Sequence, residues 1–235
     1  MPSSKHILVV DGDAQWRERM AESLTSPLHA VATAASAREA LEYAIREKPD
    51  VIVTELVLPD VTGLGFCRLL REEPALAHAG IVMVTDHADE IDRILAFEAG
   101  VDDFLPKPFY ARELASRVGA VLRRSGGPRS LLAEREPLAH SHVSVDAGTG
   151  SVLVGERRVD LTPREYHLLA ALIRQAGRVL TRRQLIGAVW GSDSAHSDRV
   201  VDAHMKSIRR KLGEAKDCVE TVRGVGYRFS ELAAR

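Results

Sequence analysis

Four polar residues in the first half of the chain each follow a short apolar run, and their types suit phosphate or metal chemistry. They are Asp11, Glu55, Thr85 and Lys107, which follow the runs 7–10, 51–54, 81–84 and 104–105. In open parallel sheets covered by helices, ligand sites lie beyond the carboxyl ends of the strands. We therefore expect these side chains to meet at one edge of a sheet, as a candidate acidic pocket.

Helical segments alternate with these runs. Besides those four strands, a weaker one is predicted at 31–34, and the predicted helices cover about 14–24, 36–48, 64–72, 90–99 and 111–124. Ser36 is the expected N-cap of the second helix, with Glu39 as its capping-box partner, and Pro49 ends that helix. Strands alternating with helices predict an α/β domain over 5–124, with a doubly wound parallel five-stranded sheet.

A second domain follows a break in this pattern. The stretch 125–137 begins Ser-Gly-Gly-Pro, has no periodicity and is predicted to be a linker. Beyond it we predict strands at 143–145, 152–154 and 159–161, helices at 162–176, 181–189 and 198–212, and a hairpin of 220–223 with 227–230. Thr162 as N-cap, Pro163 at N1 and Glu165 at N3 mark a helix start. The predicted domain covers 138–232.

The charge is divided unequally between the two halves. Residues 1–125 hold 14 Lys and Arg against 20 Asp and Glu, whereas residues 126–235 hold 18 against 13. A basic half joined to an acidic half suggests that the basic half meets a polyanion. No apolar run approaches the ~20 residues that span a bilayer, and no secretory signal is visible. We therefore expect a cytoplasmic protein that is not associated with a membrane. We expect Cys67 and Cys218 to be reduced thiols in the core.

The predicted helix 198–212 combines an apolar stripe with a basic one. Its apolar residues recur at i, i+4, i+7 and i+11 and predict a buried side. The opposite side, expected to be exposed, carries Arg199, Ala203, Lys206, Ser207 and Arg210. Cations, small residues and a hydroxyl suit a DNA major groove; a solvated helix face is the plainer alternative. In the hairpin, Arg223 could enter a minor groove, while Thr221 and Tyr227 could touch phosphates.

Four motifs in this half carry a resemblance to a known family: LTPREY, AVWG, VDAHMKSIRRKL and TVRGVGYRF. The segment resembles the winged helix-turn-helix DNA-binding domain (α+β) of OmpR/PhoB-type response regulators. The resemblance implies that 198–212 is the recognition helix, the hairpin is the wing, and double-stranded DNA is bound at direct repeats. It implies phosphate contacts from Trp190, Arg199, His204 and Tyr227, minor-groove insertion of Arg223, and base-facing positions at Ala203, Lys206, Ser207 and Arg210. Relatives with an arginine in place of Ser207 would differ in base preference.

The first domain resembles a receiver domain through ILVVDGD, PDVIVTELVLPDVTG, IVMVTD and GVDDFLPKPF. Receivers transfer a phosphoryl group from a kinase histidine to their own Asp, with acids that hold Mg²⁺ and a nearby hydroxyl and Lys. The resemblance gives Thr85 and Lys107 those last two roles and makes Phe104 the switch aromatic. The match departs from the family at three positions. Glu55 replaces the phosphoacceptor Asp, Gly12 replaces the second acid of the Asp pair, and Asp86 follows Thr85 in place of a small residue.

These departures predict a degenerate pocket. Glu55 is one methylene longer than Asp, so its carboxylate lies where a phosphoryl group would begin, and in-line attack is sensitive to ~1 Å. We expect Glu55 to pair with Lys107, to accept a hydrogen bond from Thr85 and to act without conventional phosphorylation. Mg²⁺ binding is expected to be weak or absent, with no other metal site or cofactor. Asp13 points away from the pocket on an extended segment but could bend back.

Several alternatives stay open for the pocket. Asp11, Glu55 and Lys107 could be a structural polar cluster. The chain could be a conventional phospho-switched regulator, with transfer rescued by Asp13 and another acceptor such as Asp60. The pocket could bind a small ligand or a partner protein. An enzyme such as a phosphatase is disfavoured, because no nucleophile with a base and no complete metal set is visible.

A dimer surface is the last feature implied by the resemblance. In the family, the face around 90–124 makes a symmetric homodimer through salt bridges, and this chain has matching charges at Arg93 with Glu113 and at Asp103 with Arg117. A third pair would join Glu98 to a basic residue, but the matching position is Gly119. RNA polymerase is a further expected partner, and the existence of a partner kinase stays open.

Overall fold

The computed structural model describes residues 4–125, 138–140, 143–146, 151–191 and 197–230 of the 235-residue chain. It forms two compact units, Met1–Gly126 and Gly127–Arg235. Apart from Ser125, the linker predicted over 125–137 lies outside the described residues.

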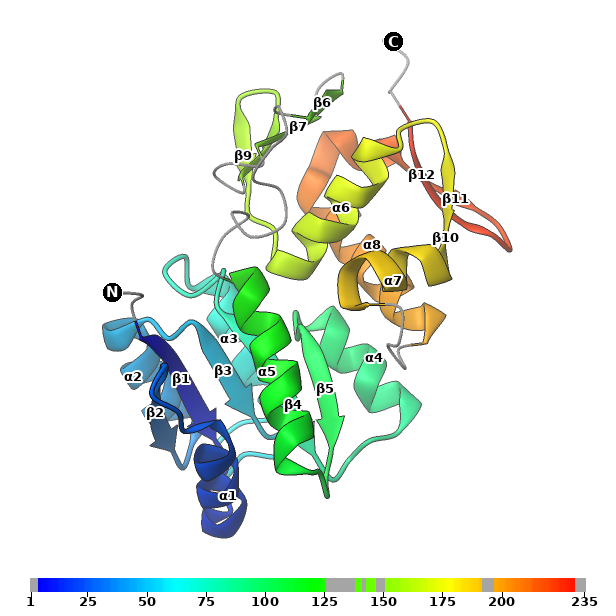
Figure 1. The fold of residues 1–235 in the computed structure, drawn as a ribbon. Helices are drawn as coiled ribbons and strands as arrows, with labels where there is room; N and C mark the ends of the chain where they lie inside the picture. Colours follow the sequence, from blue (N-terminus) through cyan, green and yellow to red (C-terminus); the bar gives the residue numbers. More distant parts are fainter. Residues whose placement is uncertain (1–3, 126–137, 141–142, 147–150, 192–196, 231–235) are drawn as a thin grey trace. The chain divides into compact units, whose positions relative to one another are not determined.

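The first unit is a parallel sheet with the strand order β2-β1-β3-β4-β5, and its helices lie on both faces (Figure 1). The strands are β1 (Lys5–Val10), β2 (His29–Ala34), β3 (Val51–Thr54), β4 (Gly80–Thr85) and β5 (Asp103–Pro106). The helices are α1 (Ala14–Leu24), α2 (Ala37–Glu47), α3 (Gly63–Glu72), α4 (Glu90–Glu98) and α5 (Ala111–Ser125). The doubly wound fold predicted from the alternation is confirmed.

Alternate residues of the central strands build two cores. One side of β1, β3 and β4 packs with α1 and α5 through residues such as Val9, Val53 and Val84. The intervening residues, among them Leu8 and Ile52, are also fully buried. Burial on both faces explains why these strands form continuous apolar runs in the sequence. It also means that polar side chains begin only where each strand ends.

At the start of α2, the predicted N-cap is correct, but the predicted capping-box contact of Glu39 differs. Ser36 Oγ accepts the N–H of Glu39. The Glu39 carboxylate accepts the N–H of Ala35, at 2.8 Å, instead of returning to the cap residue itself. The reciprocal bond of the capping box is therefore displaced by one residue.

The second unit combines two antiparallel sheets with three helices. The four-stranded sheet contains β6 (Leu138–His140), β7 (Val143–Asp146), β8 (Ser151–Val154) and β9 (Arg157–Val159). The helices are α6 (Pro163–Arg174), α7 (Arg182–Trp190) and α8 (Asp198–Leu212), and a 3₁₀ helix covers Gly213–Cys218. The three-stranded sheet has the order β10-β12-β11, with β10 (Val179–Thr181), β11 (Val219–Val222) and β12 (Gly226–Phe229).

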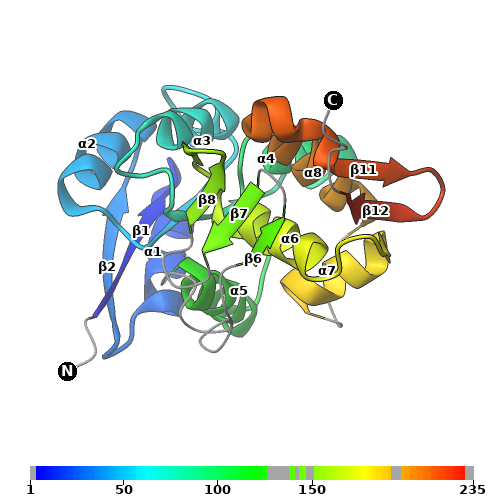
Figure 2. The ribbon, with the colours of Figure 1, turned by 90° about the horizontal axis from the view of Figure 1, so that it is seen from above.

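This arrangement is a winged helix, as predicted. Thr162 and Glu165 form the expected capping box, with Pro163 in the first turn of α6. The hairpin β11–β12 projects beyond α8 and ends in a turn (Figures 1 and 2). The strand expected over 159–161 ends at Val159 instead, because the following residues lead into the cap of α6. Cys67 and Cys218 are both buried and form no disulfide, in agreement with their prediction as core residues.

Candidate functional sites

The acidic pocket forms at the carboxyl ends of four neighbouring strands. Asp11 follows β1, Glu55 follows β3, Thr85 ends β4 and Lys107 follows β5. All four residues are buried, with at most 8% of their surface exposed. The sequence prediction that these residues meet at one edge of the sheet is therefore confirmed for the three charged groups, which contact one another directly.

Lys107 holds the pocket together. Its Nζ donates to Asp11 Oδ2 at 2.7 Å and to Glu55 Oε2 at 2.5 Å. The other Glu55 oxygen, Oε1, accepts the N–H of Leu56 at 2.6 Å. The expected Glu55–Lys107 pair is present. The expected bond from Thr85 to Glu55 is replaced by a local one, in which Thr85 Oγ1 accepts the N–H of His87 at 3.1 Å.

The ionisation of the pocket follows from these contacts. Burial lowers the pKa of Lys107, but hydrogen bonds to Asp11 and Glu55 outweigh it and the pKa is raised above its usual value. For Asp11, burial is the largest effect and raises the pKa, with Lys107 opposing it and Glu55 adding repulsion. The ammonium is thus fixed in its charged form between two carboxylates.

An aromatic group beside the pocket was not singled out from the sequence. The ring of Trp16, on α1, lies with its centroid 5.0 Å from Lys107 Nζ and 5.5 Å from the Phe109 ring. Arg19 lies over both rings. Trp16 comes one helical turn before the buried Met20, so helical periodicity could have placed it on the inner side of α1.

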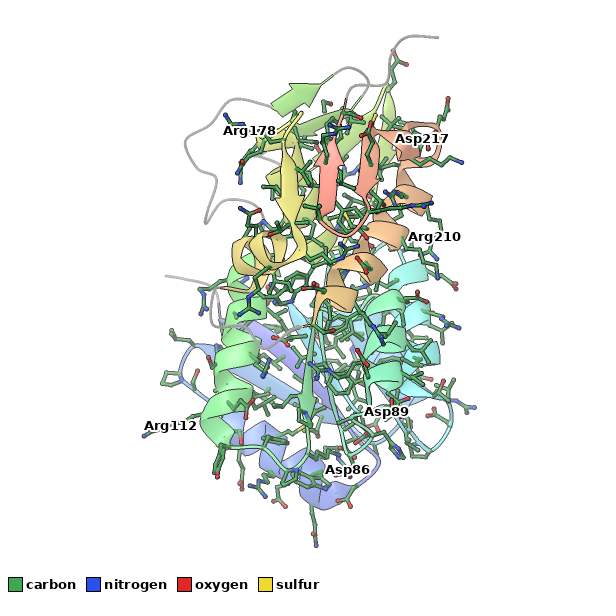
Figure 3. All side chains as sticks on the ribbon, turned by 90° about the vertical axis from the view of Figure 1, so that its right-hand side faces the viewer. Asp86, Asp89, Arg112, Arg178, Arg210 and Asp217 are labelled. Atoms are coloured by element: carbon green, nitrogen blue, oxygen red, sulfur yellow. The ribbon has the colours of Figure 1, made fainter. Side chains whose placement is uncertain are left out.

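Gly12 and Asp86, two of the departures from the receiver pattern, are exposed, and so is the neighbouring Asp13. Asp13 is the N-cap of α1, and its carboxylate accepts the N–H groups of Gln15 and Trp16. Its side chain therefore does not bend back into the pocket, because it caps the helix, and only its backbone N–H reaches Asp11. Asp86 is exposed after the end of β4 (Figure 3). Gly12 is exposed too, and a Cβ there would lie 3.0 Å from Pro59 Cγ.

Asp60, the alternative phosphoacceptor, is also engaged. Its two carboxylate oxygens accept the N–H groups of Ala37 and Arg38 at the start of α2, at 3.0 and 2.9 Å. These hydrogen bonds from Arg38 and Ala37 hold the pKa of Asp60 below its usual range. Asp60 therefore caps α2 from the β3–α3 loop.

The pocket residues do not fit an octahedral Mg²⁺ shell. Asp11 Oδ1 accepts the N–H of Asp13, and Asp11 Oδ2 and Glu55 Oε2 both accept from Lys107. Gly12 offers no side-chain oxygen. Within the described residues, no three His, Cys, Asp or Glu side chains gather into a metal-binding group.

The predicted dimer residues lie around β5 and α5. Arg117 binds Asp103 at 3.0 Å and Glu113 at 3.1 Å within the same chain. The guanidinium of Arg93 lies 5.7 Å from the centroid of the Phe104 ring, and Phe104 is buried. The Asp103–Arg117 pair is thus formed inside one protomer, whereas the homodimer stays a prediction.

On α8, the exposed basic stripe is narrower than the sequence suggested. Arg199, Lys206 and Arg210 are exposed, and Arg210, labelled in Figure 3, donates from its guanidinium to Ser207 Oγ at 3.3 Å. Ala203 and Ser207 are only 4% and 8% exposed, so their expected places on the open face were wrong. Ser207 faces α6, where its side chain hydrogen-bonds to Glu165, while the stripe of α8 in the domain core is the predicted one.

Two residues that the resemblance assigned to phosphate contacts pack toward the interior of the domain, His204 fully and Trp190 in part. His204 is 1% exposed, and its ring packs 5.5 Å from that of Trp190. Trp190 packs against the hydrophobic core and under the guanidinium of the buried Arg164. Trp190 is thus a partly buried aromatic residue at the core, and the exposed role expected of His204 is corrected.

The wing presents one cation at its tip. Arg223 is exposed beside Gly224, whose φ of +73° gives the turn a left-handed conformation that glycine adopts readily. Thr221 is exposed, and its Oγ1 accepts from Arg209 at 2.7 Å. Tyr227 is only 4% exposed and donates its hydroxyl to Asp202 at 2.6 Å. Its expected exposure to phosphate is therefore also corrected.

Comparison with known proteins accounts for both domains. Residues 7–119 match the response regulator receiver domain, and residues 155–229 match the family described as transcriptional regulatory protein, C terminal. The chain is a response regulator of the OmpR/PhoB type. Among its relatives, the Bacillus subtilis alkaline phosphatase synthesis regulator PhoP is 35% identical, covering 97% of this chain and 98% of the relative. The Pseudomonas aeruginosa phosphate regulon regulator PhoB is 34% identical, covering 96% and 97%.

Solved structures agree with this assignment. A structure of a RitR mutant, with 26% identity, covers 97% of this response regulator and 100% of its own chain at a TM-score of 0.74. DrrB, a Thermotoga maritima OmpR/PhoB homologue, covers 97% and 99% with 29% identity and a TM-score of 0.50. This response regulator is therefore a DNA-binding transcriptional regulator, of a family whose receivers imply a kinase partner. No helix among the described residues is long and apolar enough to cross a membrane.

Proposed function

We propose that this response regulator controls transcription without conventional aspartyl phosphorylation. The observation that carries the proposal is the buried contact of Lys107 with Glu55 and Asp11, at 2.5 and 2.7 Å. Glu55 places a carboxylate one methylene beyond the position of the usual Asp. Its negative charge, paired with Lys107, stands in permanently for the phosphorylated state, although a phosphoryl group carries more charge and more oxygens.

The surroundings of the pocket support this proposal. Phosphoryl transfer depends on metal ions and positioning more than on covalent chemistry, and here the available acids already serve Lys107, helix α1 and helix α2. Mg²⁺ binding is accordingly weak or absent. A kinase that recognises this receiver would find no free aspartate at the acceptor position.

The second part of the proposal concerns DNA. Helix α8 enters the major groove of double-stranded DNA with Arg199, Lys206 and Arg210, and the wing places Arg223 in the adjacent minor groove. Support comes from the exposure of all four cations, on one helix stripe and one turn, and from the fit of an α-helix to the major groove. Binding occurs on direct repeats as a homodimer formed through the receiver, in the cytoplasm and in contact with RNA polymerase.

One experiment tests the switch. The full chain is treated with acetyl phosphate and Mg²⁺, and its intact mass and its footprint on genomic DNA fragments are measured with and without treatment. We expect no added phosphoryl group and an unchanged footprint. A wild-type species heavier by one phosphoryl group and labile to hydroxylamine would overturn the proposal and favour a conventional phospho-switch.

A further inference from the structure

A cluster of four side chains joins the recognition helix to the wing. Asp202, on α8, accepts from Arg182 Nε at 2.7 Å and from the Tyr227 hydroxyl at 2.6 Å. Arg182 is the first residue of α7, and Tyr227 lies on β12. One carboxylate thus ties together two helices and a strand of the wing.

Arg209 completes the connection from the other side. Its guanidinium donates twice to the backbone carbonyl of Val219, at 2.8 and 2.6 Å, and once to Thr221 Oγ1 at 2.7 Å. The same guanidinium lies 5.5 Å from the centroid of the Tyr227 ring, and that of Arg182 lies 5.1 Å from it. The tyrosine ring is therefore held by two cations while its hydroxyl holds Asp202.

We propose that Asp202, Tyr227, Arg182 and Arg209 form a brace that fixes the wing relative to α8, so that the helix and Arg223 meet DNA together. Within this brace Tyr227 and Asp202 are positioning residues and not DNA ligands. The inference rests on the placement of α8 and the wing against DNA proposed above.

The burial and charge of the brace support this role. Tyr227 is almost fully buried. Burial, followed by the hydrogen bond to Asp202, raises its pKa to about 12, so its hydroxyl remains a donor throughout the physiological range. Asp202 lies on the basic stripe, three residues after Arg199 and four before Lys206, and its side chain is 43% exposed. A carboxylate there would repel phosphates, and the pairing with Arg182 offsets that charge.

Whether the substitution of Asp202 weakens or strengthens DNA binding distinguishes a brace from a simple surface charge. Replacing an acidic residue near DNA with a neutral one ordinarily strengthens binding, because phosphates dominate affinity. Asp202→Ala should instead weaken binding by about fivefold or more, the lower end of measured couplings between sites. Asp198→Ala is the matched control, because Asp198 is an exposed acid in the first turn of the same helix. We expect it to leave affinity unchanged or to raise it slightly.

Tyr227→Phe removes the hydroxyl and keeps the ring between its two cations. Binding of the full-length variants is measured on a duplex of about 30 base pairs, long enough for two half-sites one helical turn apart, selected from a random pool by the wild-type chain. Tyr227→Phe should also weaken binding, and in the Asp202→Ala background it should have no further effect, because coupled residues are not additive. Minor-groove protection under the wing should be lost while major-groove protection under α8 remains.

Each contrary result has a clear meaning. Tighter binding by Asp202→Ala, or purely additive losses, would overturn the brace, and additivity would favour a direct phosphate contact from Tyr227. Retained major-groove protection shows that the variants are folded. If Lys206→Ala and Arg223→Ala left the wild-type footprint unchanged, the proposed DNA placement itself would fail, independently of the brace.

Discussion

The two domains use charged side chains in opposite ways. In the receiver, Lys107 is buried between Asp11 and Glu55, so the charges of the pocket satisfy one another. In the winged helix, Lys206 and Arg210 are exposed on α8, and Arg223 is exposed on the wing. The charges of the receiver pocket, which we call the closed set, pair with one another, whereas those of the winged helix, the open set, are exposed to solvent.

The difference shows how far a family resemblance extends at each site. The receiver retains the fold, Thr85 and Lys107, but it carries Glu55 and Gly12 where the family pattern has two aspartates. The winged helix differs at several positions from the expected contact pattern, yet it retains an exposed cationic stripe. Membership in the family therefore assigns DNA binding securely, whereas the pocket has to be judged from its own contacts.

The largest expected effect is a loss of DNA affinity when a cation of the open set, on α8 or the wing, is removed. Lys206→Ala, Arg210→Ala and Arg223→Ala should each weaken DNA binding by roughly 5- to 150-fold, since a good base contact contributes ~1–3 kcal/mol. Lys206→Ala and Arg210→Ala should have the larger effects or relax sequence preference. The measurement is a titration of the selected duplex at several salt concentrations.

The control for these variants is Lys216→Ala, an exposed cation of the same domain located in the 3₁₀ helix. It should leave affinity close to wild type. Counterion release also predicts a steep decrease of affinity with salt for the fragment 126–235. A fragment with no salt-sensitive affinity for DNA would contradict the proposed contacts.

The next largest effect is expected on the stability of the receiver, when the closed set of charges in its pocket is disrupted. Glu55→Ala removes one of the two partners of the buried Lys107 and leaves the N–H of Leu56 without its acceptor. Breaking a buried pair costs ~3–5 kcal/mol, and because Asp11 remains we expect a loss of about 2–3 kcal/mol in the free energy of unfolding of the receiver. Glu55→Gln keeps the oxygen acceptors and should lose less. Chemical denaturation measures both.

The pH dependence of this loss follows from Lys107. Its pKa in the folded state is raised above 10.5, so its contribution is present in full below that pH and is lost as pH rises through the folded-state pKa. The difference between wild type and Glu55→Ala should therefore be constant from neutral pH to about pH 10 and decrease above it. Glu47→Ala, at an exposed ion pair on α2, is the control and should cost ~0–1 kcal/mol.

Much of the fold could be predicted because local signals agreed with tertiary packing. The predicted bounds of α1, about 14–24, and of α8, 198–212, agree with the structure, and α8 has a clear apolar stripe along its whole length. Strands β6 and β10 were missed, because each has only three residues. Strand β10 also gains its pairing from β12, far along the chain, which local sequence does not reveal, whereas β6 pairs with the next strand, β7. The 3₁₀ helix after α8 was missed for the same lack of a local signal.

The candidate sites were predicted less completely. Strand ends identified Asp11, Glu55 and Lys107, because topology alone brings them together. Helical periodicity assigned Ser207 to the open face, but its side chain hydrogen-bonds to Glu165 of α6, a polar contact that a prediction from an apolar stripe does not anticipate. The hydroxyl of Tyr227 was assigned to phosphate, since its partner Asp202 lies 25 residues away in sequence.

A smaller effect is expected from rebuilding the pocket. Glu55→Asp alone should not accept a phosphoryl group, because Gly12 still lacks its carboxylate. Glu55→Asp with Gly12→Asp should accept one on part of the molecules treated with acetyl phosphate and Mg²⁺. The new side chain would crowd Pro59, at 3.0 Å from its Cγ, and adding Pro59→Ala should increase the phosphorylated fraction. Intact mass measures that fraction, and phosphorylation of the single variant would show that Gly12 is not the limiting change.

The smallest expected effect concerns association through α4, β5 and α5. Arg117 already binds Asp103 and Glu113 within one chain, and exposed ion pairs contribute only ~0–1 kcal/mol each. Glu113→Lys would place a cation beside Arg117 and opposite the expected Arg93 of a second copy. Sedimentation of the full chain should then shift modestly toward monomer, and Arg93→Glu in the same chain should recover part of the dimer. Because Arg93 lies over Phe104 in its own protomer, the single variant Arg93→Glu separates that contact from the dimer pair. Sedimentation that is identical for wild type, Glu113→Lys and the double variant would exclude these pairs as the basis of association.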